Sequence, residues 1–170
     1  MMAVLLIIAI AAVISMPLLH EQLAIREIDS VARRFIAHAH FARGQALYLG
    51  ESFKMAPITE GKWESGWSIT SGCIASNRKS NCSSKVWLSH GKIEPVFFRG
   101  ANKSFIDPHT GRAGILFNAA GAAKTAQGGF VANRMILGHQ RVGRLERHLI
   151  LGSGGRWRIC DPARDAKRCH

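Results

Sequence analysis

Acidic residues are scarce in this sequence, because 11 Asp and Glu stand against 23 Lys and Arg among 170 residues. The resulting formal net charge of +12 favours polyanionic partners such as nucleic acid or anionic lipid, although it says nothing about fold. Charged residues make up only 20% of the chain and apolar residues 47%, which excludes a disordered protein. The length suits one domain with its own core and argues against a multidomain enzyme.

The usual catalytic motifs are also absent. No G-x-S-x-G nucleophile element occurs, and the glycine run at residues 152–155 is not followed by the Lys-Ser/Thr of a P-loop. His38 and His40 are two residues apart on a predicted helix, so they face different directions and do not form a metal pair. We therefore expect no catalytic activity, no cofactor and no metal site.

No lysine or arginine precedes Arg26, and the segment from Met1 to Leu19 is apolar except for Ser15. Nineteen residues come close to the roughly 20 that span a bilayer as a helix, so residues 1–19 are predicted to form a single-pass transmembrane half-helix. A cleaved signal peptide is disfavoured, because such peptides begin with a basic region and end at a small-x-small site. Arginines placed just after the span conflict with the positive-inside rule, which suggests that the natural start lies upstream of Met1.

Residues 20–50 are predicted to continue the same helix in amphipathic form. Apolar residues recur there at steps of three and four, and Gly50 is a plausible C-terminal stop. An unbroken helix from Met1 to Leu49 would be roughly 70 Å long, with a bend at Pro17. The stripe consists of Ile28, Val31, Ala32, Phe35, Ala39, Ala42, Ala46 and Leu49.

From Gly61 onward the pattern changes to short β-type runs separated by Gly, Asn, Ser and Pro, so residues 61–170 are predicted to form a β-rich globular domain. The last two runs, joined by a glycine-rich link, predict an antiparallel C-terminal hairpin over residues 148–160. The whole is an α+β fold, in which a long N-terminal helix packs on one face of an antiparallel sheet. The predicted strands are Trp67 to Thr70, Val86 to Ser89, Pro95 to Arg99, Gly114 to Asn118, Phe130 to Ile136, His148 to Leu151 and Arg156 to Cys160.

Cys73, Cys82, Cys160 and Cys169 form two pairs with the same gap of eight residues. Local disulfides, Cys73 with Cys82 and Cys160 with Cys169, are favoured among the three possible connectivities, and the second would close a tail over residues 160–169. Disulfides place the domain in an oxidising compartment. A zinc site formed by these cysteines and His170 is the weaker alternative, because zinc ligands are usually more tightly spaced.

The sequence resembles the GspH/FimT family of type IV minor pilins and type II secretion pseudopilins over nearly its whole length. No single element is specific, but their combination and order are. The elements are the apolar run with Pro17, Trp63-x-x-Gly66-Trp67, Gly114-Ile115-Leu116-Phe117 followed by Gly121, Gly129-Phe130, and the ending His148-Leu149-Ile150-Leu151 to Gly155-Arg156-Trp157-Arg158-Ile159-Cys160.

The resemblance implies assembly rather than catalysis. It implies a single-pass inner-membrane protein with its C-terminal domain in the periplasm, extracted by an assembly platform into a filament of other pilins or pseudopilins. Pro17, Ile28, Val31 and Phe35 would belong to the membrane and filament helix, although packing on the protein's own sheet also explains the last three. The family's basic leader, its early glutamate and its N-methylated residue are missing from this chain, which again suggests an upstream start.

Gly155-Arg156-Trp157-Arg158 matches the GRxR pattern associated with DNA binding in FimT proteins. In a strand, the two arginines project to one face and Trp157 and Ile159 to the other, so paired guanidinium groups would meet a phosphate backbone. From Arg134 to His170 nine Lys and Arg face three Asp and Glu. The further candidate contacts are Arg147, Arg164, Lys167 and Arg168.

The resemblance and the charge favour a FimT-like minor pilin that binds extracellular DNA without sequence specificity during uptake. The alternative is a GspH-like pseudopilin of a type II secretion system with a purely structural role, in which the Gly-Arg pair is only turn geometry and the arginines are a solvated face. A soluble secreted nucleic-acid binder is a third possibility, and it requires cleavage of the apolar run.

Overall fold

The computed structural model describes residues 2–72, 85–101, 105–108, 110–123, 129–152 and 154–169, without the side chains of residues 3–18, 101 and 168. One long helix precedes eight strands and a short 3-10 helix, Ala166–Arg168. The elements are α1 (Met2–Leu49), β1 (Ser52–Thr59), β2 (Lys62–Gly72), β3 (Val86–His90), β4 (Val96–Ala101), β5 (Ile115–Phe117), β6 (Asn133–His139), β7 (Glu146–Leu151) and β8 (Trp157–Cys160).

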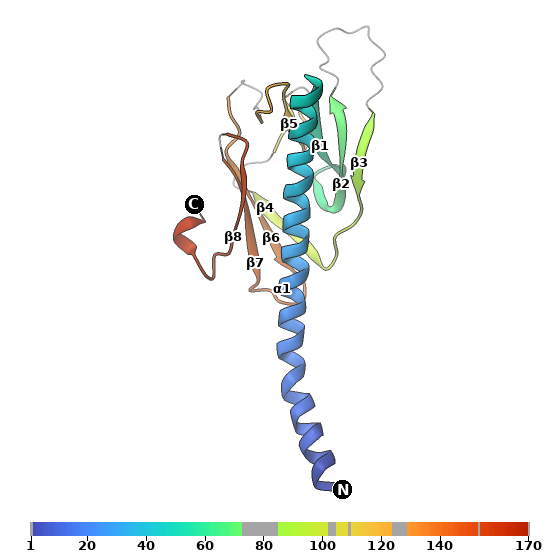
Figure 1. Ribbon diagram of the computed structural model, residues 1–170, viewed down its shortest axis with the longest axis vertical. Coiled ribbons are helices and arrows are strands. Elements are labelled where there is room, and N and C mark those ends of the chain that lie inside the picture. The colour runs from blue at the N-terminus through green and yellow to red at the C-terminus, as the bar shows by residue number, and fades with distance from the viewer. Residues whose placement is uncertain are drawn as a thin grey trace.

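Helix α1 confirms the predicted α+β class and runs without a break through position 17. It ends where the sequence predicted, because Gly50 adopts a φ of 66°, a conformation that glycine accepts without steric cost. Figure 1 shows its C-terminal half against the strands and its N-terminal half extending beyond them. Within the part of the chain that the structure describes, no helix combines the length and the hydropathy that a membrane span requires.

The strands form two antiparallel four-stranded sheets, ordered β3-β2-β1-β5 and β4-β6-β7-β8, where the sequence had predicted one (Figure 1). Phe35 of α1 shows how one helix packs against both sheets. Its ring makes edge-to-face contacts with Trp67 of β2 and Trp157 of β8, at centroid distances of 5.1 and 5.5 Å. The apolar stripe of the helix therefore lies over the seam between the sheets, where its alanines allow the strands to approach closely.

Most strands lie near their predicted positions, but β2 begins at Lys62, five residues before the predicted Trp67, and β1 and β6 also differ. Strand β1 was missed, although Phe53 and Met55 are fully buried and alternate with the half-buried Lys54. Strand β6 begins at Asn133, three residues later than predicted, and Phe130 is 59% exposed. In β1 and β6, the position of the strand follows from which side chains pack into the core, and not from how apolar the local sequence is.

Two ion pairs and a histidine–carboxylate hydrogen bond attach the sheet β4-β6-β7-β8 and its β6–β7 connection to the middle of helix α1. All three acidic residues of α1 are paired with a basic residue from the segment 139–147. This arrangement fixes the rotation of α1 relative to the sheet that carries the C-terminal hairpin. The pairs are Glu21 with Arg144, Glu27 with His139 and Asp29 with Arg147, each at 2.7 Å.

Candidate nucleic-acid interface

The predicted hairpin is present, with Ile150 opposite Arg158 and Leu151 opposite Trp157 in the β7–β8 register. Two backbone hydrogen bonds close its turn. The N–H of Gly155 donates to the carbonyl of Gly152, and the N–H of Gly152 donates to the carbonyl of Arg156, both at 2.9 Å. Arg156 therefore stands at the junction between the turn and strand β8.

The residues of β8 separate into a buried and an exposed set. Trp157 is 8% exposed and packs against Phe35 and Phe105, while Arg156 and Arg158 are exposed. Ile159 departs from the expected alternation, because it lies on the side of Trp157 but is 38% exposed at this edge of the sheet. The two arginines thus flank a tryptophan that anchors their strand in the core.

Gly155 is required by geometry at this position. Its φ is 73°, which L side chains rarely adopt. A Cβ added there would lie 3.3 Å from both the carbonyl oxygen of Gly121 and Nε of Arg43 on α1. The turn therefore sits tightly against the end of the helix, and its backbone position is not freely adjustable.

Arg147, predicted as a DNA contact, is an internal residue. Its guanidinium is buried between two carboxylates, with Nε 2.7 Å from Oδ1 of Asp29 and Nη1 3.2 Å from Oδ2 of Asp161. Alternate residues of β7 project to the same face of the sheet. Arg147 therefore shares a face with Leu149 and Leu151, which are buried toward α1. Arg147 is thus on the helix side of the sheet and is withdrawn from the set of candidate phosphate contacts.

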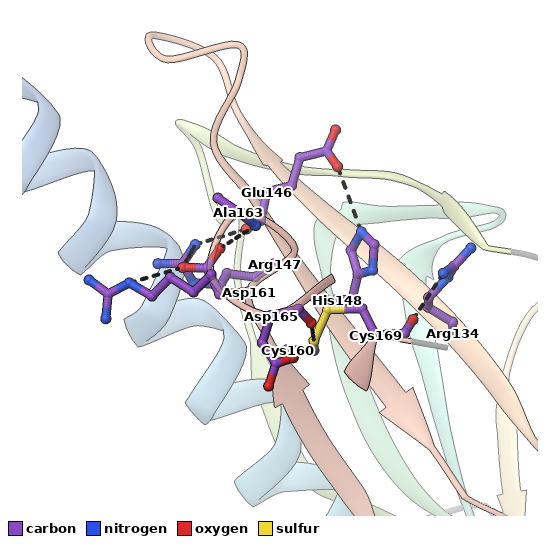
Figure 2. The surroundings of a disulfide bond; sticks show 10 residues. Arg134, Glu146, Arg147, His148, Cys160, Asp161, Ala163, Asp165 and Cys169 are labelled. Atoms are coloured by element: carbon purple, nitrogen blue, oxygen red, sulfur yellow. Dashed lines mark hydrogen bonds and ion pairs between the residues drawn. A yellow bond between two sulfur atoms is a disulfide. The ribbon is translucent and has the colours of Figure 1, made fainter. Parts of the chain in front are cut away.

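The C-terminal tail folds back on the hairpin, and a disulfide joins Cys160 to Cys169 (Figure 2). Of the tail cations predicted to contact DNA, Arg164 and Lys167 are exposed, and Nε of Arg164 lies 3.6 Å from Asp161. The side chain of Arg168 and the pair Cys73 and Cys82 lie outside the described residues.

His148 and Arg134 lie beneath the tail on the outer face of the sheet (Figure 2). Nη1 of Arg134 donates to the carbonyl of Cys169 at 3.1 Å, so the end of the chain is attached to β6. Burial, aided by the nearby Arg134 charge, lowers the pKa of His148 despite the opposing effect of Glu146. This neutral imidazole supports the tail and adds no positive charge to the surface near neutral pH.

Residues 31–169 match the family described as type II transport protein GspH. The chain belongs to this family. Two crystal structures of the type IV minor pilin FimU of Pseudomonas aeruginosa PAO1 share its fold, at TM-scores of 0.59 and 0.56 and 16% identity. They cover 81% and 79% of this chain and 91% and 94% of FimU. The minor pseudopilin EpsH of the Vibrio cholerae type 2 secretion system has a TM-score of 0.53 at 8% identity, covering 80% of this chain and 98% of EpsH.

At such identities the likeness to FimU and EpsH shows the fold alone. No curated protein matches the sequence with significance. The GspH-family fold therefore stands on the family match and on these structures, and the choice between pilus and secretion system must come from the chain's own surface.

The helix residues expected in the filament are used inside this GspH-family domain. Ile28 and Phe35 are fully buried against the chain's own sheets, and Val31 is half-buried. Packing on the domain itself therefore accounts for them. The side of α1 that remains exposed includes Leu19 and Leu23, at 60% and 51%.

Arg43 is the cation near the hairpin that sequence reasoning missed. It is more than 100 positions before Gly155 in the chain, and only the packing of α1 against the turn brings them together. No local signal marked it, because it is one of four arginines in α1 and its sequence neighbours do not distinguish it from the others. Among the described residues, no group of three or more His, Cys, Asp or Glu is arranged to hold a metal ion.

Proposed function

We propose that this GspH-family protein is a minor pilin of a type IV pilus that binds extracellular DNA without sequence specificity during DNA uptake. The observation that carries the proposal is the exposed pair Arg156 and Arg158 on either side of the buried Trp157. Trp157 is held in the core and fixes the backbone of β8. The guanidinium groups of Arg156 and Arg158, on the opposite face of the strand, therefore bind a ligand with little loss of backbone entropy.

Assembly would proceed through α1. The apolar residues 1–19 would hold the protein in the inner membrane, with the β-rich part in the periplasm, until the assembly platform extracts it into a filament of other pilins. The exposed apolar side chains of Leu19 and Leu23 support this role, because they continue the apolar surface toward the sheets without covering any strand.

Contact with DNA would rest mainly on phosphates. Guanidinium groups form paired hydrogen bonds with phosphate oxygens, and such contacts release counterions and supply affinity for any sequence. Arg156 has no ion-pair or hydrogen-bond partner among the described side chains, so binding a phosphate does not require breaking an internal pair. Arg164 and Lys167, exposed on the disulfide-closed tail, extend the same basic surface.

The test is fluorescence anisotropy of labelled duplex DNA with the chain of residues 1–170 in nonionic detergent, across a salt series. Arg156→Ala/Arg158→Ala should weaken binding and flatten the log-log salt slope by about 0.9 for each lost phosphate contact. The matched control is Arg26→Ala/Arg33→Ala, which removes the same charge from exposed positions of α1. Equal effects of the two double variants would mean that binding follows net charge and that the hairpin is not the site.

The second candidate is a minor pseudopilin of a type II secretion system, favoured by the match to the family described as type II transport protein GspH. In that case the Gly-Arg pair is turn geometry and the filament exports proteins. Failure of the wild-type protein to bind DNA near physiological salt would move this candidate ahead.

A further inference from the structure

Three segments distant in sequence meet at the turn of the β7–β8 hairpin. They are the C-terminal part of α1, the turn 118–122 and the hairpin turn itself. Nε of Arg43 donates a hydrogen bond to the carbonyl of Gly121 at 2.8 Å. The same guanidinium faces Gly155, since a Cβ on that glycine would lie 3.3 Å from Nε and 3.5 Å from Cζ.

The acceptor of this hydrogen bond is itself held in place. Oδ1 of Asn118 accepts hydrogen bonds from the backbone N–H groups of Ala120 and Ala122, at 3.1 and 2.9 Å. The N–H of Gly121 donates to the carbonyl of Asn118 at 2.7 Å. Arg43 is therefore fixed by a rigid turn, and its guanidinium loses little conformational entropy when it binds a ligand.

Within the described part of the chain, no group accepts a hydrogen bond from the two Nη groups of Arg43. The guanidinium is half-buried, and only its Nε has a hydrogen-bond partner among the described residues. The three segments contain no acidic residue that would neutralise the guanidinium charge: residues 38–49, 118–123 and 152–158 have no Asp or Glu. A positive group in this position adds to the field of Arg156, which directly follows Gly155.

We infer that Arg43 is a second phosphate-binding arm of the interface, acting beside Arg156 across the backbone of Gly155. This inference rests on the proposed DNA-binding function and names a residue from the helix as part of the site. Nε holds the guanidinium against Gly121, and the Nη edge faces a phosphodiester oxygen. The consequence is that α1, through which the subunit would assemble, also forms part of the DNA site.

The experiment uses the chain of residues 1–170 in nonionic detergent and duplex DNA in a salt series. Arg43→Gln should reduce affinity about 3- to 10-fold at low salt and flatten the log-log salt slope by about 0.9, one phosphate contact. Combined with Arg156→Gln, the slope should fall by about twice that amount. The matched control is Arg33→Gln, an equal charge loss at an exposed position of the same helix, which should leave the slope unchanged.

Arg43→Lys separates contact from scaffolding, because it keeps the charge but loses the planar Nε–H that holds Gly121. It should retain the wild-type slope with intermediate affinity, and far-UV circular dichroism establishes whether each variant is folded. Wild-type binding with an unchanged slope in Arg43→Gln overturns the inference and leaves the proposed function standing. Absence of wild-type binding overturns both.

Discussion

Asp29 of α1 and Arg147 of β7 form an ion pair that ties the helix to the sheet carrying the hairpin, with Nε and Oδ1 2.7 Å apart. The arginine also reaches Asp161 in the tail, at 3.2 Å. One buried guanidinium thus connects the helix, a central strand and the disulfide-closed tail. Arg147, which the sequence predicted as a DNA contact, instead holds together the elements that carry the exposed arginines.

Arg147→Gln should lower the free energy of unfolding by about 2–3 kcal/mol, because it leaves two carboxylates facing a buried site without their cation. Asp29→Asn should cost less, about 1–2 kcal/mol, since Asp161 still pairs with Arg147. The control is Glu94→Gln, in an ion pair with Lys92 whose two side chains are 53% and 63% exposed. That change should cost less than about 0.5 kcal/mol. Urea titrations measure all three, and similar values for Arg147→Gln and Glu94→Gln would refute the structural role.

Gly155→Ala should damage stability and DNA binding together. The new Cβ meets the carbonyl of Gly121 and the guanidinium of Arg43, and alanine at a φ of 73° costs about 1–2 kcal/mol. The neighbouring Gly154 offers a matched control, because a Cβ there meets nothing within 4 Å. Gly154→Ala should therefore leave both the urea midpoint and the DNA affinity close to wild type. Loss of affinity in Gly154→Ala alone would show that turn flexibility, and not the position of Gly155, matters.

The stability of the fold should fall in mild acid, in part through His38. The indole N–H of Trp67 donates to Nδ1 of His38 at 3.0 Å, so protonation of that nitrogen breaks the bond. Burial first, and then the charges of His90 and Arg34, lower the pKa of His38 from 6.5. A depressed pKa means that the unfolded chain binds more protons, so this contribution is complete above pH 6.5 and is lost as the pH falls below it.

Thermal melts at pH 7.5 and 5.0 check this expectation. In His38→Asn the side-chain Oδ1 takes the place of Nδ1 and accepts the Trp67 hydrogen bond at both pH values, so the drop in Tm between them should be smaller than in wild type. His40→Asn, which removes an exposed imidazole from the same helix, should leave the drop unchanged. An equal drop in wild type and His38→Asn would assign the acid sensitivity to other groups.

Local sequence patterns predicted the helix, its end at Gly50 and the C-terminal hairpin, because each depends on neighbours in the chain. Apolar periodicity also identified Phe35 as a packing residue, but not that it lies between two sheets. The division into two sheets depends on which strands pair over long separations, and no periodicity encodes that.

The candidate site was predictable only in part. Arg156 and Arg158 were found because strand alternation around a buried tryptophan separates them from the core. The same reasoning failed for Arg147, because an arginine facing the core needs a carboxylate partner, and Asp29 is 118 positions away. Arg43 was missed for the same reason, since its role depends on a tertiary contact with Gly155.

The disulfide between Cys160 and Cys169 should stabilise the domain by about 2–3 kcal/mol, the value expected for closing a loop of this length. Cys160→Ala/Cys169→Ala, compared with wild type in urea titrations, measures it without reducing other cysteines. Without the disulfide, the tail that carries Arg164 and Lys167 is no longer crosslinked to β8. Arg158 keeps its position, because β8 remains paired with β7. If DNA contact is centred on the turn, the log-log salt slope should flatten in this variant by less than about 0.9, the value for one phosphate contact. A flattening that corresponds to two or more lost contacts would place the centre of the interface on the tail and not on the turn.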